Sequence, residues 1–169
     1  MLRIVKILSL AVVLSAINFT ANAAGAYYGI KGGLFEVENS SYDKAANIGF
    51  IVGADITASS VHSVSLEGEY TTTVIDGDLA GGGEWSINTF GLFAAFRAGG
   101  RLYFKGKIGY IDREINYSSG GTSDRNSLAY GLGFGIRRGT TTKLEFEYAV
   151  IDDDNTFADI NFISVAYLF

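Results

Sequence analysis

Charged side chains recur at every second position in three short segments of this sequence. The pairs are Lys105 and Lys107, Glu67 and Glu69, and Glu145 and Glu147. In a β-strand, residues two apart point to the same face, so each pair is directed to one side of a sheet. Charges that leave water need a partner of opposite sign. The spacing therefore predicts ion pairs between strands.

The predicted network has six bases and five acids, which leaves it nearly balanced in charge. Its members are Lys31, Asp55, Glu67, Glu69, Arg97, Lys105, Lys107, Arg137, Lys143, Glu145 and Glu147. The segments that carry them are not all neighbours along the chain, so the pairs must cross an enclosed space. We expect the network to fill and occlude that space.

Other chemistry is poorly supported by the sequence. His62 is the only histidine and lies in a predicted turn, and a Ser–His hydrolase needs nucleophile and base within hydrogen-bonding reach. Residues 131–135 alternate glycine with apolar residues and lack the spacing of a nucleotide-binding loop. Asp152, Asp153 and Asp154 are weak candidates for a metal site, because they lack the pattern of a calcium-binding loop. No enzyme activity and no cofactor are expected.

Eight predicted strands position the charged pairs. They cover residues 27–35, 48–56, 63–74, 85–97, 102–110 or beyond, 127–137, 142–150 and 161–169. Long loops follow the odd strands (36–45, 75–84, 118–126 and 152–159), and short turns follow the even ones. The final strand alternates Ile163, Val165, Tyr167 and Phe169 on one face, and its edge needs a partner. Pairing it with the first strand closes an antiparallel up-and-down barrel.

The alternation leaves two barrels possible. A soluble, lipocalin-like exported barrel is apolar inside, whereas a membrane barrel is apolar outside. Three features favour the membrane barrel: glycines on the polar face, the balanced charge of that face, and aromatic residues near the ends of the apolar stripe (Tyr28, Tyr70, Tyr110, Tyr148 and Phe169). The sequence thus predicts a lipid-facing exterior and a polar, filled lumen.

Residues 1–23 have the pattern of a secretory signal peptide. Arg3 and Lys6 precede an apolar run, and residues 21–23 fit the cleavage rule. Residues 24–169 then form one domain. The whole chain has a net charge of −5, and loss of Arg3 and Lys6 with the signal peptide leaves the domain with −7. The absence of cysteine removes disulfides and thiolate metal sites. The acidic balance gives no basic footprint for nucleic acid.

Four segments resemble the small outer-membrane β-barrel family of the OmpA/OmpX type. They are A-Y-Y-G-I-K-G-G, L-Y-F-K-G-K-I-G-Y, Y-G-L-G-F-G-I-R-R and the closing I-S-V-A-Y-L-F. The resemblance implies a bacterial outer-membrane location and a monomer. It also implies contact with membrane lipid and lipopolysaccharide, and assembly by periplasmic chaperones and the barrel-assembly machinery. Tyr167 and Phe169 would form the assembly signal.

The implied role is envelope-structural or adhesin-like, with a small-solute channel as the alternative. The end of the barrel that carries the predicted long loops has thirteen acids and only three bases, Lys44, Arg113 and Arg125. We expect this acidic rim to be bridged to lipopolysaccharide phosphates by Mg²⁺ or Ca²⁺, or else to be simply a solvated surface.

Overall fold

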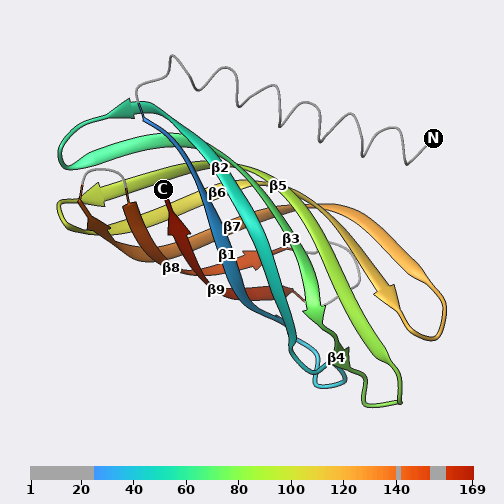
Figure 1. Cartoon of the computed structure of the whole chain (residues 1–169). Helices are drawn as coiled ribbons and strands as arrows, with labels where there is room; N and C mark the ends of the chain where they lie inside the picture. Colours follow the sequence, from blue (N-terminus) through green and yellow to red (C-terminus); the bar gives the residue numbers. More distant parts are fainter. Residues whose placement is uncertain (1–24, 140–141, 153–158) are drawn as a thin grey trace.

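The computed structural model describes residues 25–139, 142–152 and 159–169, which form nine strands (Figure 1). The strands are β1 (Ala26–Val37), β2 (Ala45–Ala58), β3 (His62–Ile75), β4 (Gly77–Asp78), β5 (Glu84–Gly99), β6 (Leu102–Tyr117), β7 (Thr122–Arg138), β8 (Thr142–Ile151) and β9 (Ile160–Leu168). The part of the chain covered by these ranges contains no helix long and apolar enough to cross a membrane.

Eight of these strands close an antiparallel barrel. The order β3-β2-β1-β9-β8-β7-β6-β5 is completed by pairing of β3 with β5, and β1 pairs with β9. The backbone N–H of Phe169 donates to the carbonyl of Tyr28 at 2.7 Å, which extends this closure to the last residue. Closure satisfies the edges of both terminal strands, so the predicted eight-stranded barrel is confirmed. The two-residue β4 is an addition that pairs with β5 beyond the point where β3 leaves it.

The two faces of the barrel have opposite character. Apolar and aromatic side chains cover the exterior, including Phe104 at 76% exposure and Leu132 at 73%. Lysines, glutamates and Arg97 are buried in the lumen. This is the reverse of a soluble lipocalin-like barrel, and it matches a barrel whose outer face contacts lipid.

Long connections and short turns lie at opposite ends of the barrel. We call the end with connections 38–44, 79–83 and 118–121 the loop end, and the end with turns 59–61 and 100–101 the turn end (Figure 1). The strands β5, β6 and β7 project furthest at the loop end. The predicted loop 118–126 was therefore too long, because Thr122–Asn126 pair with β6 as part of β7. Lumen-facing Ile111 and Ile115 continue the alternation of β6 and extend this hairpin.

The first two connections at the loop end are joined to each other. The N–H of Asp43 donates to the carbonyl of Asp78 at 2.8 Å, and Tyr42 forms a β-bridge with Leu79. Trp85 is buried beneath them and donates its indole N–H to the carbonyl of Asp43 at 2.9 Å. Burial raises the pKa of the neighbouring Tyr117 to about 12, with a further contribution from Tyr42. These connections thus form a packed cap rather than separate loops.

Candidate functional site

The lower layer of the lumen is organised around Arg97. Its Nε and Nη2 contact both carboxylate oxygens of Glu145, at 2.7 and 3.3 Å, and Nη2 also contacts Glu67. Tyr27 donates its hydroxyl hydrogen to Glu67 at 2.7 Å, and Tyr103 donates to Glu145 at the same distance. One guanidinium therefore links two carboxylates, and each carboxylate is also held by a tyrosine. A bidentate, charge-assisted arrangement of this kind fixes geometry as well as charge.

Two lysines and two glutamates form the next layer. Lys31 lies 2.7 Å from Glu69 and 2.8 Å from Glu147. Lys107 lies 2.6 Å from Glu69 and 2.8 Å from Glu147. Each lysine thus contacts both acids, and each acid contacts both lysines. The four side chains form a closed ring of alternating charge across the lumen.

Lys105 joins the two layers. Its ammonium lies 3.0 Å from Glu67, 2.9 Å from Glu145 and 3.1 Å from Glu147. The whole network then contains four bases and four acids, and all eight side chains are buried. Buried charge is costly unless each group is paired and hydrogen-bonded, and the complete pairing here meets that requirement.

The network is built from a pattern that occurs twice in the chain. Leu66–Tyr70 reads L-E-G-E-Y on β3, and residues 144–148 read L-E-F-E-Y on β8. The tyrosine that bonds the first glutamate lies on β1 in one half and on β6 in the other. In the closed sheet, β1 lies four strands from β6, and β3 lies four strands from β8. The lumen therefore has an approximate two-fold axis along the barrel, which Arg97 and Lys105 break.

A glycine beside each network tyrosine makes room for its ring. Gly53 is the register partner of Tyr27, and Gly135 is the partner of Tyr103. A Cβ on either glycine would overlap the adjacent tyrosine ring. Both tyrosines can therefore lie flat against the barrel wall and reach the glutamate one strand further on.

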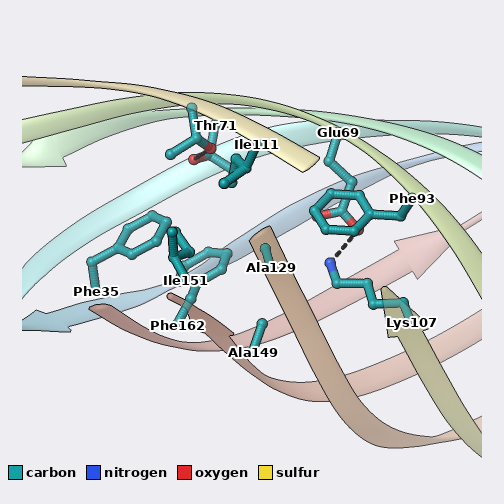
Figure 2. A pocket seen from close by; sticks show the side chains of 11 residues that line it. Phe35, Glu69, Thr71, Phe93, Lys107, Ile111, Ala129, Ala149, Ile151 and Phe162 are labelled. Atoms are coloured by element: carbon teal, nitrogen blue, oxygen red, sulfur yellow. Dashed lines mark hydrogen bonds and ion pairs between the residues drawn. The ribbon is translucent and has the colours of Figure 1, made fainter. Parts of the chain in front are cut away.

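Above the charged layers, the lumen becomes apolar toward the loop end. Phe35 stacks on Phe162 with ring centroids 4.0 Å apart, and Phe93 covers the ammonium of Lys107 at 4.1 Å from its ring centroid (Figure 2). The cavity between these residues has a volume of about 20 Å³. That is room for about one water molecule. This cavity therefore has no room for a larger solute.

The structure places the other predicted lumen residues at the turn end. Arg137 donates to the carbonyls of Gly99 and Gly100 and lies over the ring of Tyr103, with its Cζ 4.7 Å from the ring centroid. The ammonium of Lys143 lies 4.3 Å from the ring centroid of Tyr27. Asp55 accepts a hydrogen bond from Ser65 at 2.6 Å. These three residues surround the lumen mouth, outside the group of eight.

The remaining predicted site residues lie away from the lumen network. Tyr167 and Phe169 pack edge to face on the lipid-facing side of the final segment, with centroids 4.8 Å apart. Among the weak metal candidates, Asp152 directly follows the last residue of β8, and Asp153 and Asp154 lie outside the described residues. No group of three or more potential metal ligands occurs within 25–139, 142–152 and 159–169. His62 Nδ1 lies 3.0 Å from the hydroxyl of Ser59, which also accepts backbone N–H groups of the same turn.

Comparison with known proteins identifies the family of this chain. The sequence profile of the outer membrane protein beta-barrel domain matches residues 7–169. The chain belongs to this family. The outer membrane protein beta-barrel family is bacterial, so the outer-membrane location expected from the sequence is confirmed, as is the resemblance to the small OmpA-type barrels. A search among curated proteins found no match.

Solved structures of other outer membrane proteins share the fold at low sequence identity. Ail, the attachment invasion locus protein of Yersinia pestis, has a TM-score of 0.58 at 15% identity, covering 85% of this chain and 96% of its own. Neisserial surface protein A has the same TM-score at 14% identity, covering 87% and 97%. The outer membrane enzyme PagL has a TM-score of 0.54 at 10% identity, covering 86% and 99%. In outer membrane barrels the long loops are extracellular and the short turns periplasmic, which orients this barrel.

The sequence pattern did not identify two kinds of lumen residue. Tyr27 and Tyr103 were both missing from the predicted network, because the glycines that make room for them, Gly53 and Gly135, are recognised only once the strands are paired. The apolar residues of the upper lumen were also missed, because alternation assigns a face and gives no height along the barrel. Phe93 shows this: it shares its face with Arg97 but lies in a different layer.

Proposed function

We propose that this outer-membrane barrel does not conduct solutes and instead presents its packed extracellular cap as an interaction surface. The observation that carries the proposal is the filled lumen. Eight paired charges occupy its middle, apolar side chains fill its upper part, and the cavity between them holds about 20 Å³. An eight-stranded barrel is just wide enough to be filled in this way.

The cap supports a role in binding rather than a purely structural one. Its connections are held by backbone hydrogen bonds and by Trp85, so the exposed groups have fixed positions. Pre-organised groups bind with a smaller entropic penalty than mobile ones. The exposed side chains of the cap are mainly acidic and polar, including Glu38, Asp43 and Asp78.

The sign of the charge indicates the class of partner. Ail has been solved in complex with the heparin analogue sucrose octasulfate, a polyanion. The described loop end of the present protein has eleven acids and three bases, which would repel a polyanion. A basic protein surface, or an anionic surface bridged by divalent cations, fits this charge.

Lipopolysaccharide is the anionic surface nearest to this rim. Because no described group of three ligands could hold a metal by itself, Mg²⁺ or Ca²⁺ would be shared between rim carboxylates and lipopolysaccharide phosphates. This arrangement requires single carboxylates at the membrane boundary. Asp112 lies two residues beyond the last lipid-facing tyrosine of β6, Tyr110, and so shares its face.

Catalysis has little support in the described residues. Ser59 and His62 are within hydrogen-bonding distance, but the serine hydroxyl also donates to the His62 carbonyl and accepts two N–H groups as a turn cap. The pair lies at the turn end, away from the outer leaflet. The likeness to the enzyme PagL is therefore one of fold.

Two measurements test the proposed function. In planar bilayers the purified protein should give no stable conductance, and nanosiemens-scale openings would instead support the small-channel alternative. Whole cells or proteoliposomes should bind a cationic protein such as cytochrome c in a salt-dependent manner. Substituting the cap carboxylates Glu38, Asp43 and Asp78 together with the matching amides should abolish that binding and leave folding intact. Equal binding by both proteins would contradict the role of the cap.

A further inference from the structure

The two ends of the barrel carry opposite charge. The loop end is acidic, whereas four exposed or partly exposed bases lie at the turn end: Arg101, Arg137, Arg138 and Lys143. Outside the buried network, Asp55 is the only acid among the described residues at that end. The periplasmic rim of the barrel is therefore basic.

Two of these bases already have partners in the protein. Arg137 is held by the carbonyls of Gly99 and Gly100, and Lys143 lies over the ring of Tyr27. By contrast, the side chains of Arg101 and Arg138 are exposed and make no hydrogen bond or ion pair with any described residue. Two guanidinium groups at the same end of the molecule are thus available to an external anion.

The fold brings Arg101 and Arg138 to the edge of the lipid-facing surface. Leu102 of β6 pairs with Ile136 of β7, and the N–H of Arg137 donates to the carbonyl of Arg101 at 2.8 Å. Arg138 lies two positions beyond Ile136 and so shares its lipid-facing side. The exposed Leu102 and Phe104 continue that apolar surface into the membrane. Both arginines therefore lie at the level where an apolar surface meets polar headgroups.

We propose that Arg101 and Arg138 form a binding site for the phosphate of an anionic phospholipid in the periplasmic leaflet. The planar guanidinium fork matches phosphate oxygens, and two forks can hold one phosphate. An acyl chain of the same lipid packs along Leu102 and Phe104 (64% and 76% exposed). A soluble phosphate lacks this apolar contact, so the site selects a lipid. Each arginine near an anionic membrane surface contributes roughly a fivefold gain in affinity.

The test measures retention of phosphatidylglycerol by the intact barrel in detergent, by native mass spectrometry during a lipid titration. We expect one high-affinity lipid on the wild-type protein and affinity weaker by roughly 25-fold in Arg101→Gln/Arg138→Gln. Lys44→Gln removes an exposed base at the opposite end and serves as the matched control; it should bind like wild type. Glycerol phosphate at the same concentration should not compete.

A second variant and a second lipid make the result decisive. Arg101→Lys/Arg138→Lys keeps the charge and loses the forks, so it should recover only part of the affinity. Lipid A added in place of phosphatidylglycerol distinguishes the leaflets: we expect it not to occupy this site. Equal retention of phosphatidylglycerol by wild type and the glutamine variant, or a stronger preference for lipid A lost in that variant, would overturn the proposal.

Discussion

Lys31 and Lys107 lie four strands apart in the closed sheet and contact the same two carboxylates, those of Glu69 and Glu147. The four distances fall between 2.6 and 2.8 Å. Around the barrel the charges alternate in sign at every second strand, from β1 to β8 to β6 to β3. If any member of this ring loses its charge, two opposite charges are left under-compensated. Substitutions that remove one charge therefore test how far the stability of the barrel depends on charge pairing in the lumen.

Removing Arg97 should destabilise the barrel strongly. In Arg97→Met the buried carboxylates of Glu67 and Glu145 keep only Lys105 and their tyrosines as partners. Breaking a buried ion pair on one side costs about 3–5 kcal/mol. We expect a loss of that size in urea unfolding of the protein in detergent micelles or lipid vesicles.

A second substitution distinguishes charge balance from loss of packing. Arg97→Met/Glu145→Gln leaves three bases and three acids in the network, so it should recover part of the lost stability. Lys44→Gln breaks the exposed pair with Glu36 at 3.1 Å and should cost less than about 1 kcal/mol. If the double variant is less stable than Arg97→Met, charge balance is not what stabilises the lumen.

Gly135→Ala should disturb the network although the substitution replaces no charged residue. The added Cβ would overlap the ring of Tyr103 and displace its hydroxyl from Glu145. Overpacking of this kind costs about 1–3 kcal/mol. Gly53→Ala should act similarly through Tyr27, because the arrangement is repeated.

The matched control is Gly106→Ala on the outer face, where the nearest atom to the new Cβ is Leu132 Cδ2 at 3.8 Å. It should leave the unfolding midpoint unchanged. Equal effects of Gly106→Ala and Gly135→Ala would show that the loss comes from glycine itself rather than from the tyrosine ring.

The sequence predicted the faces of the barrel well and the layers within it less well. Glu67 and Glu69 had to share a face because they are two residues apart, and the structure has them on one face of β3. Asp55 and Arg137 also lie on the polar faces of their strands, yet the structure has them at the turn-end mouth of the lumen, outside the network. Their distance from the network depends on strand register, which a single strand does not encode.

The final aromatic residues should matter for insertion. Phe169 closes the barrel through hydrogen bonds with Tyr28 in both directions and stacks on its ring at 5.5 Å. Changing both Tyr167 and Phe169 to serine should lower the heat-modifiable, folded fraction recovered from outer membranes. Val165→Ser alters the same lipid-facing side of β9 without this contact and should insert more efficiently. Equal insertion of the two variants would remove the proposed assembly signal.

Divalent cations should stabilise the extracellular rim if it is bridged to lipopolysaccharide. Addition of a chelator should lower the thermal unfolding temperature in lipopolysaccharide-containing vesicles. Asp76→Asn/Asp78→Asn should reduce that response, whereas Asp76→Glu/Asp78→Glu, which retains the charge, should preserve it. An unfolding temperature unaffected by chelator in all three proteins would show a solvated acidic rim with no bridge.

The positions of the network residues along the chain also determine the order in which their charges are paired during folding. A chain assembled only as far as β6 contains Lys31, Arg97, Lys105 and Lys107 but only two of the four acids, Glu67 and Glu69. Its interior would carry an excess of two positive charges, which must stay hydrated until β8 delivers Glu145 and Glu147. Expulsion of water and closure of the seam between β1 and β9 are therefore late, coupled events. Unfolding of the complete barrel must open the β1–β9 seam and rehydrate the buried charges together, so we expect it to be slow.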